Sequence, residues 1–307
     1  MQKTYALHEP VMFKETIESL NLKPGMVVAD CTLGLGGHSA EILKRIGPKG
    51  FLYAFEKDER NLVLAKALLE RVAKNFEIFH DSFASLKDRL RGKGILHLDA
   101  IFFDLGLSSP HVDQPERGFS FNSDGPLDMR FDASKGITAA EILNRWPEEK
   151  IAEIFWKYGE ERRSRKLAKA VATDRKKKKF NSTLEFGNLV ERVLGRDRVA
   201  AIFQSLRIAV NEELEALELG ITQAIELLAP HGRVVVLSYH SLEDRIVKSI
   251  FKKFATDLRD PTDIFGGRVL RSKLLSLLSK KPIYPSQEEI QSNNRARSAI
   301  MRAAEKL

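Results

Sequence analysis

The chain has 307 residues and a formal net charge of +8, with 43% hydrophobic and 30% charged residues. These proportions are typical of a soluble globular protein with one large domain or two smaller ones. Its single cysteine, Cys31, excludes an internal disulfide and a cysteine-based metal site, and we expect no metal. No apolar run is long enough to span a membrane and no secretory signal is recognised, so we expect a cytoplasmic protein without membrane contacts.

The first predicted element is a short strand, residues 27–30, that ends in Asp30. A glycine-rich turn with Gly34, Gly36 and Gly37 follows, and then a helix that includes residues 41–43. Strand, glycine turn and helix together are typical of nucleotide-binding sites in open α/β sheets. Glycine lets the backbone approach a ligand and adopt angles that a Cβ forbids. The alternative is a turn that only joins the strand to the helix.

A second predicted strand, residues 51–55, is followed directly by Glu56. A carboxylate at the end of the second strand, about 20 residues beyond the glycine turn, is placed to accept hydrogen bonds from ribose hydroxyls. A solvated glutamate in the charged segment 56–60 is the alternative, and the spacing makes it the weaker one. We therefore expect a ligand that contains a nucleoside.

Two more predicted strands, residues 76–80 and 100–104, lead to the same edge of the sheet. Phe83 follows the third strand and is placed to flank an adenine, and Asp104 ends the fourth. Ligands of open parallel sheets bind beyond the carboxyl ends of the strands, so we expect Asp30, Glu56 and Asp104 to meet there. Each acid taken alone has a structural alternative, such as capping a helix.

The glycine pattern helps to distinguish two nucleoside ligands. NAD-binding turns carry a third small residue, Gly or Ala, where this chain has Ser39. Methyltransferases that use S-adenosylmethionine commonly have an acid followed by alternating small residues, a pattern matched here by Asp30, Thr32, Gly34 and Gly36. The turn therefore favours methyl transfer, with a nucleotide-dependent oxidoreductase as the rival enzyme.

Residues 111–216 do not alternate between strands and helices. Capping sequences at Thr138 and Ser182 predict two helix starts, and Pro147 suits the first turn of another helix. Apolar residues at 151, 154, 155 and 158 form a helical stripe. We expect this segment to be an inserted all-helical domain that recognises the substrate and covers the cofactor edge. Residues 1–110 and 217–307 then form the cofactor-binding domain.

The positive charge is concentrated in this predicted helical domain. Residues 162–179 contain ten lysines and arginines and a single acid, Asp174. Clustered cations gain affinity for a polyanion because they release its counterions. A solvated helix face is the alternative, and the pattern alone does not identify the polyanion as RNA. The four lysines at 176–179 predict a mobile loop.

The sheet pattern resumes at residues 232–237, after a helix that ends near Pro230. Ser286 caps a last helix, and residues 298–304 are expected to form the closing strand. His240 follows the fifth strand at the edge that holds Asp104, so these two are the candidate catalytic residues; a structural histidine is the alternative for His240. Phe119 and Phe121 are placed either to stack on an extruded base or to anchor the core.

Several separated motifs resemble one family, the bacterial 16S ribosomal RNA (cytosine-N4)-methyltransferases, also called RsmH or MraW. The matching stretches span nearly the whole chain in the expected order: residues 8–11, 30–39, 104–110, 117–121, 124–130, 238–245 and 295–298. The resemblance implies a Rossmann-like sheet that binds S-adenosylmethionine, and methylation of N4 of a cytidine in the decoding region of 16S rRNA.

The resemblance also carries site residues and partners. Positions that match the family's cofactor contacts are Gly36, Gly37, His38, Glu56, Phe83 and Asp104, and His111 stands where a further contact is usually glutamine. The implied partner is 16S rRNA or the small ribosomal subunit, and a homodimer is compatible with the resemblance. A non-catalytic ribosome-assembly factor that keeps the fold to bind RNA is the alternative from a different class.

Overall fold

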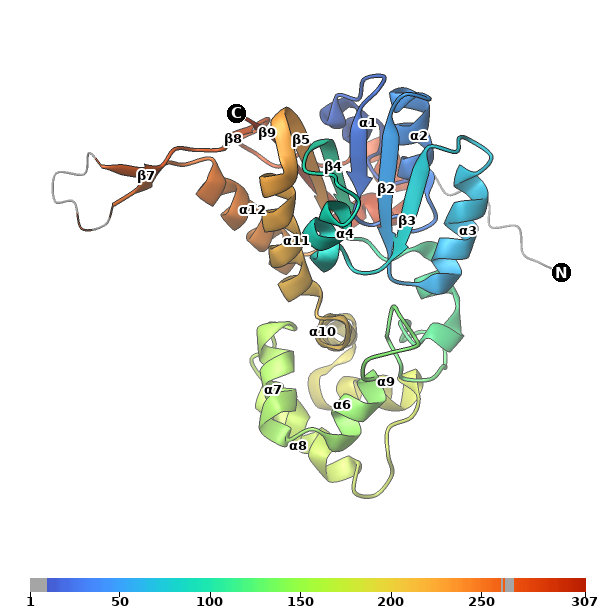
Figure 1. Cartoon of the computed structure of the whole chain (residues 1–307). Helices are drawn as coiled ribbons and strands as arrows, with labels where there is room; N and C mark the ends of the chain where they lie inside the picture. The colour runs from blue at the N-terminus through green and yellow to red at the C-terminus, as the bar shows by residue number, and fades with distance from the viewer. Residues whose placement is uncertain (1–9, 261, 263–267) are drawn as a thin grey trace. The chain divides into compact units, whose positions relative to one another are not determined.

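The computed structural model describes residues 10–260, 262 and 268–307 (Figure 1). The chain divides into two compact units. Residues up to Gly106 and Leu214–Leu307 form one, which we call the sheet unit, and Leu107–Glu213 form the other, the helical unit. The inserted segment differs from the expected range 111–216 by four residues at its start and three at its end.

The described part of the sheet unit contains a seven-stranded sheet in the order β3-β2-β1-β4-β5-β9-β8. The five strands from β3 to β5 are parallel, whereas β9 is antiparallel to β5 and β8. The strand order reverses between β1 and β4, which is where ligands bind in sheets of this kind. The strands are β1 (Val27–Asp30), β2 (Phe51–Glu56), β3 (Phe76–His80), β4 (Leu98–Asp104), β5 (Leu228–Ser238), β8 (Leu275–Leu277) and β9 (Ile300–Lys306).

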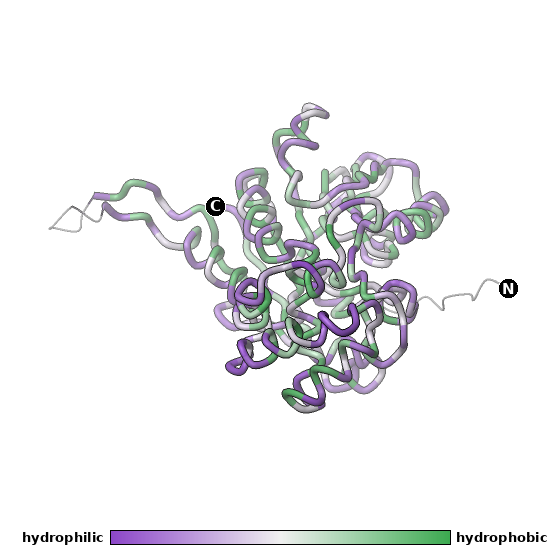
Figure 2. Tube along the Cα trace, turned by 90° about the horizontal axis from the view of Figure 1, so that it is seen from below, coloured by the Kyte–Doolittle hydropathy of each residue, from purple (hydrophilic) through white to green (hydrophobic). Residues whose placement is uncertain are grey.

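Helices cover both faces of this sheet. The helices of the sheet unit are α1 (Phe13–Leu20), α2 (Gly37–Ile46), α3 (Glu59–Leu69), α4 (Leu86–Arg91), α11 (Glu213–Leu227), α12 (Ser241–Phe254) and α13 (Gln287–Ser292), with short 3₁₀ helices η1 (Phe83–Ser85) and η4 (Asn294–Ser298). In Figure 2, helical stretches of the tube change between hydrophilic and hydrophobic along their length. The buried residues of α1, α2, α3, α4, α11 and α12 form the sides that pack on the sheet, whereas α13 has no buried residue.

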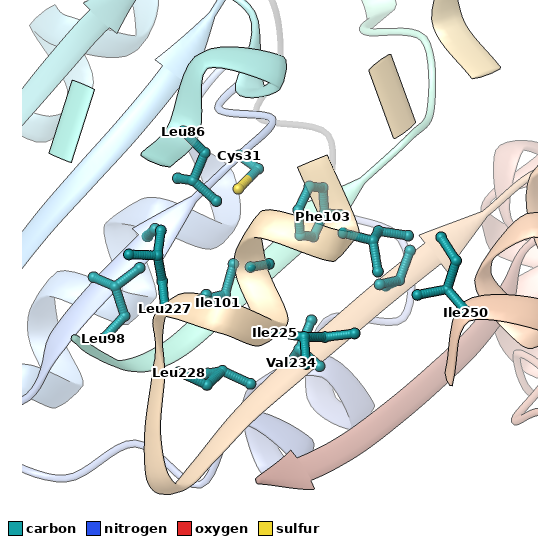
Figure 3. Packing of buried hydrophobic residues seen from close by; sticks show 14 of the residues in the cluster. Cys31, Leu86, Leu98, Ile101, Phe103, Ile225, Leu227, Leu228, Val234 and Ile250 are labelled. Carbon is teal, nitrogen blue, oxygen red and sulfur yellow. The ribbon is translucent and has the colours of Figure 1, made fainter. Parts of the chain in front are cut away.

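The sheet separates two hydrophobic cores because successive residues of a strand face opposite sides. In β4, Ile101 and Phe103 pack in one core with α4, α11 and α12, and Ala100 and Phe102 pack in the other with α1, α2 and α3. Figure 3 shows part of the first core, where Ile225 of α11 lies near these strand residues. Burial on both faces explains why the central strands are continuous apolar runs.

The chain between β5 and β9 differs from the sequence prediction. The helix α11 ends at Leu227, so Pro230 lies in β5 and not at the end of a helix. The closing strand begins at Ile300, after the 3₁₀ helix η4, and not at residue 298. Two short strands, β6 (Leu258–Arg259) and β7 (Val269–Arg271), pair with each other away from the large sheet (Figure 1). These strands are too short and too exposed to show an apolar alternation in the sequence.

The helical unit has a hydrophobic core of its own. Its helices are α5 (Ser109–Asp113), α6 (Ala139–Arg145), α7 (Glu148–Lys157), α8 (Ser164–Asp174), α9 (Thr183–Leu194) and α10 (Val199–Asn211), with 3₁₀ helices η2 (Pro115–Arg117) and η3 (Arg196–Arg198). The hydroxyls of Thr138 and Ser182 accept backbone N–H groups three residues on, so both predicted caps are confirmed. Pro147 itself caps α7, one position before its predicted place, and Tyr158 lies just past the end of that helix.

No helix in the described part of the chain combines the length and the apolar character needed to cross a bilayer.

Candidate active site

Asp30 ends β1 and ties the glycine turn to the helix that follows. Its Oδ1 accepts the N–H of Thr32 at 3.0 Å, and its Oδ2 accepts the hydroxyl of Ser39 at 2.6 Å. Burial raises the pKa of Asp30 to about 6, and both hydrogen bonds oppose that rise. Because both oxygens accept hydrogen bonds, Asp30 stabilises the turn at Thr32 and its junction with α2 at Ser39. Direct contact of Asp30 with a cofactor stays a prediction.

The glycine turn needs glycine for two different reasons. Gly34 and Gly36 have φ of 55° and 85°, in the left-handed region that favours glycine. Gly37 begins α2, and a Cβ there would lie 2.6 Å from Cγ of Pro10. Glycine is thus needed at 34 and 36 for the backbone angles and at 37 because Pro10 packs against it. A sharp glycine turn after the first strand is typical of nucleoside-binding sheets.

Glu56 ends β2 and joins that strand to the turn. Its Oε1 accepts the N–H of Asp58 at 2.8 Å. The backbone at Gly34 and Lys57 also favours the charged form of the carboxylate. Desolvation raises the pKa of Glu56 to about 7, although the side chain remains partly exposed. An acceptor at this place, in contact with the glycine turn, suits the predicted binding of ribose hydroxyls.

Asp104 ends β4 and uses its two oxygens differently. Oδ1 accepts the hydroxyl of Tyr239 at 2.8 Å and the N–H of Gly106 at 3.3 Å. Oδ2 lies 3.7 Å from Nδ1 of His38 and makes no hydrogen bond among the described residues. Desolvation raises the pKa of Asp104 to about 6, and the nearby charge of Asp30 contributes to the rise. One oxygen of this carboxylate is therefore held and the other is available.

The three acids meet at one edge of the sheet, as predicted. In the parallel register, Asp30 pairs with Ala54 of β2 and with Phe102 of β4, so Glu56 and Asp104 lie two residues further along, at the same edge of the sheet. A hydrogen bond of 2.5 Å from the Asp104 N–H to the Thr32 hydroxyl links β4 to the turn. We call this region the carboxyl edge.

His38 lies in the first turn of α2 beside Asp104. The ring is buried and packs near Phe13 and Phe102, with ring centroids 5.7 Å and 4.7 Å away. Burial lowers the pKa of His38 to about 3, so the imidazole is neutral near pH 7 and forms no ion pair with Asp104. A neutral ring at this place fits the predicted contact with a cofactor.

Phe83 is anchored by the core of the sheet unit. It begins η1, and its ring meets Phe103 edge-on with centroids 5.4 Å apart. A Cβ at Gly220 would lie 2.6 Å from this ring. The partly exposed ring is thus fixed in place, and its predicted contact with adenine stays a prediction.

His240 has a structural role, which was the alternative to a catalytic one. It is the N-cap of α12: Nδ1 accepts the N–H of Glu243 at 3.4 Å, and Nε2 lies 2.9 Å from Oε1 of Glu243. The other oxygen, Oε2, accepts the N–H of Tyr239 at 2.7 Å. A catalytic role for His240 stays a prediction, whereas sequence reasoning missed Tyr239, which contacts Asp104 directly.

The remaining candidates belong to the helical unit, apart from His8 of the motif at residues 8–11, which lies outside the described residues. His111 lies in α5, with Nδ1 2.9 Å from the Ser108 hydroxyl and its ring 5.0 Å from Phe119. Phe119 and Phe121 pack against the core of the helical unit, as in the core-anchor alternative. A cofactor contact by His111 stays a prediction.

The basic segment 162–179, which the structure describes in full, divides into engaged and available cations. Arg163 donates to the carbonyl of Leu194, and Arg175 donates to the carbonyls of Leu143 and Trp146. Lys177 and Lys178 approach Asp174 and Glu185. Six cations are exposed and make no side-chain hydrogen bond or ion pair among the described residues; we call them the cation set: Arg162, Arg165, Lys166, Lys169, Lys176 and Lys179.

Comparison with known proteins decides the family. The model of the MraW methylase family matches residues 5–307. The chain belongs to the MraW methylase family. Membership confirms the predicted fold class, methyltransferase activity and S-adenosylmethionine as the cofactor, and it leaves the oxidoreductase interpretation without support. The residues present fit this cofactor, because the sharp glycine turn is flanked by Glu56 and by the available oxygen of Asp104.

Similar proteins cover the chain almost end to end. A protein of Dictyoglomus thermophilum named ribosomal RNA small subunit methyltransferase H is 43% identical, over 100% of this chain and 99% of the relative. A protein of Brevibacillus brevis with the same name is 40% identical over 98% of each. The solved structure of an rRNA methylase from Streptococcus thermophilus has 12% identity and a TM-score of 0.44, covering 98% of this chain and 99% of that one.

Proposed function

We propose that this protein methylates the exocyclic N4 of a cytidine in the decoding region of 16S rRNA. The observation that carries the proposal is the match of the MraW methylase family to residues 5–307, together with full-length relatives named ribosomal RNA small subunit methyltransferase H. The arrangement at the carboxyl edge supports methyl transfer to an amine, and the cation set supports a polyanionic substrate.

At the carboxyl edge, the cofactor would be held by groups with separate roles. Glu56 would accept hydrogen bonds from the ribose hydroxyls, and Phe83 would flank the adenine. The backbone at Gly36 and Gly37 would lie against the ligand, with His38 behind it. Asp30 would act through Thr32 and Ser39, the two groups that it holds.

The chemistry asks little of the protein beyond alignment, exclusion of water and removal of one proton. Bound S-adenosylmethionine supplies an activated methyl group and a neutral leaving group. A cytosine amine is a weak nucleophile because its lone pair is delocalised into the ring. Oδ2 of Asp104 would accept a hydrogen bond from that amine and then take up the proton released on methylation. A carboxylate with a pKa of about 6 is ionised near pH 7 and basic enough for this task.

The helical unit would bind the RNA. The cation set would contact phosphates, and such contacts fix position without reading sequence. Free 16S rRNA and the small ribosomal subunit both present these phosphates. A homodimer and a cytoplasmic location stay predictions.

A transfer assay tests the proposal. Purified protein with labelled S-adenosylmethionine is expected to label small-subunit RNA, and nucleoside mass spectrometry is expected to find N4-methylcytidine in the product. The same modification should be missing from rRNA of a strain that lacks the protein. RNA binding without any transfer of label would instead identify a non-catalytic assembly factor.

Calorimetry tests the assignment of the cofactor site. S-adenosylhomocysteine should bind and NADH should not. Glu56→Ala should weaken binding by about tenfold to a hundredfold, because hydrogen bonds to a charged group are removed. Glu70→Ala removes an exposed carboxylate of the same unit and should leave affinity unchanged. Equal affinities for the two variants would refute the assignment of Glu56.

A further inference from the structure

One hydroxyl touches the carboxylate on which the proposed reaction depends. Tyr239 directly follows β5, which pairs with β4 so that Leu237 lies opposite Asp104. The Tyr239 hydroxyl donates to Oδ1 of Asp104 at 2.8 Å. Together with the N–H of Gly106, this hydrogen bond occupies Oδ1 and leaves Oδ2 available.

The lack of a side chain at Gly106 makes room for the Tyr239 ring. A Cβ at Gly106 would lie 2.8 Å from Cε2 and 2.9 Å from Cζ of the Tyr239 ring. Side-chain atoms essentially never approach a real Cβ that closely. Glycine at 106 therefore allows the ring to reach Asp104 and also supplies the second donor to Oδ1.

The buried side chain of Glu243 holds the backbone of Tyr239. Its N–H donates to Oε2 of Glu243 at 2.7 Å, and the Glu243 side chain is buried. The second oxygen of Glu243 lies 2.9 Å from Nε2 of His240. His240, Glu243 and Tyr239 thus form a continuous chain of contacts that ends at Asp104. Through these contacts, His240 is connected to Asp104 within the protein.

We propose that Tyr239 is a positioning residue for methyl transfer, which fixes the Asp104 carboxylate so that Oδ2 faces the reacting amine. The inference rests on the proposed function, since it acts through Asp104. A carboxylate that already accepts two hydrogen bonds at one oxygen cannot rotate without breaking them. Fixing the acceptor before the substrate arrives removes a reorganisation cost from the reaction.

The groups that face Asp104 determine how its titration responds. His38 faces it from α2, Asp30 from β1, Glu243 from α12 and Tyr239 from the end of β5. Burial raises the pKa of Asp104 most and the two acids add to the rise, whereas the Tyr239 hydrogen bond lowers the pKa because it favours the charged form. Loss of the hydroxyl should therefore raise the pKa of Asp104.

The test compares Tyr239→Phe with Tyr53→Phe, which removes a hydroxyl from β2 of the same sheet. In single-turnover methylation of small-subunit RNA, Tyr239→Phe should lower the rate constant about tenfold or more, with the KM for RNA unchanged. The acid limb of its pH–rate profile should move to higher pH. Tyr53→Phe should match the wild type in rate constant and profile. A wild-type rate constant and acid limb in Tyr239→Phe would overturn the inference.

A readout that is independent of activity separates this inference from the proposed function. In ¹³C NMR titration of the aspartate carboxyls, assigned with Asp104→Asn, the Asp104 pKa should rise in Tyr239→Phe and stay unchanged in Tyr53→Phe. Failure of the wild type to methylate RNA would refute the proposed function, whereas an unmoved Asp104 pKa would refute the coupling to Tyr239.

A second variant covers the case in which Tyr239→Phe fails to fold. Gly106→Ala keeps the hydroxyl but forces the ring to move, so it should produce the same decrease in rate and the same shift of the acid limb. Where Tyr239→Phe does fold, adding Gly106→Ala to it should lower the rate less than adding Gly106→Ala to the wild type, because the hydrogen bond to Asp104 is already absent. Additive effects of the two substitutions would contradict a shared route through Asp104.

Discussion

The two units of this protein carry their charge in opposite ways. At the carboxyl edge of the sheet unit, Asp30, Glu56 and Asp104 have raised pKa values and accept hydrogen bonds from defined donors. In the helical unit, the cation set is exposed and makes no side-chain hydrogen bond or ion pair among the described residues. The role proposed for the carboxyl edge depends on the position of individual atoms, whereas the role proposed for the cation set depends on the number of charges. Single substitutions should therefore be severe in one unit and mild in the other.

A similar contrast exists inside the carboxyl edge. Burial raises the pKa of both Asp30 and Asp104 to about 6. Yet each oxygen of Asp30 accepts a hydrogen bond from the protein, whereas only Oδ1 of Asp104 does so among the described residues. A raised pKa therefore does not by itself distinguish Asp104 from Asp30, whereas the available oxygen of Asp104 does.

The largest expected effect separates these two acids. In Asp104→Asn, the amide oxygen can keep the hydrogen bonds at Oδ1 while the amide nitrogen takes the place of Oδ2. We expect a folded protein whose single-turnover methylation, at saturating cofactor, falls about 10²- to 10⁴-fold. In Asp30→Asn, the new amide N–H₂ group faces either the Thr32 N–H or the Ser39 hydroxyl, and one of these hydrogen bonds is lost. This variant should therefore have a free energy of unfolding lower by about 1–3 kcal/mol.

Urea unfolding and methylation measured on both variants check this contrast. Thr16→Val, in α1, is a control for a buried polar substitution away from the edge. An active Asp104→Asn enzyme, or an Asp30→Asn protein as stable as the wild type, would show that the two acids have been assigned the wrong roles.

A smaller effect is expected in the helical unit, where charges act collectively. Replacing four members of the cation set by Ala (Arg165, Lys166, Lys176 and Lys179) should weaken RNA binding. The slope of log K against log salt concentration should flatten by about 0.7 for each phosphate that the variant no longer neutralises. The affinity for S-adenosylhomocysteine should not change.

The matched control removes the same charge from exposed lysines of the sheet unit: Lys23, Lys49, Lys66 and Lys74. Filter binding across a series of salt concentrations measures both proteins. If the control flattens the slope as much as the test variant, the cation set has no special role and net charge alone attracts the RNA.

Features that depend on neighbouring residues were predictable from the sequence, and contacts between distant residues were not. The five parallel strands, the acids at their ends and the two helix caps all have local patterns, and each lies where predicted within a few residues. The cation set also follows from composition along one segment. In contrast, the Tyr239–Asp104 hydrogen bond joins residues 135 positions apart, and no local pattern reports it.

Two further features lie beyond local sequence patterns. His240 caps α12 with a side chain that is unusual at such positions, so the capping box with Glu243 did not match the usual Ser or Thr pattern. The engagement of both Asp30 oxygens depends on how Ser39 is turned in α2. In each case the role is decided by the partner that folding brings close, and the sequence shows only that a polar residue is present.

The smallest expected effect is a pH-dependent gain of stability in Asp104→Asn. The pKa of Asp104 in the folded protein, about 6, exceeds its ordinary value of 3.8, so the folded state binds this proton more tightly than the unfolded state does. The stability that this provides is complete below about pH 4 and is lost as the pH rises through 6. Asparagine does not titrate, so the melting temperature of the variant relative to wild type should rise by a few degrees between pH 4.5 and pH 7.5.

Asp30→Asn should show no net gain at pH 7.5, because the hydrogen bonds that it breaks outweigh the removed charge. A wild-type advantage over Asp104→Asn that grows with pH would mean that the ionised carboxylate is stabilised in the folded protein, contrary to the desolvation that its burial imposes.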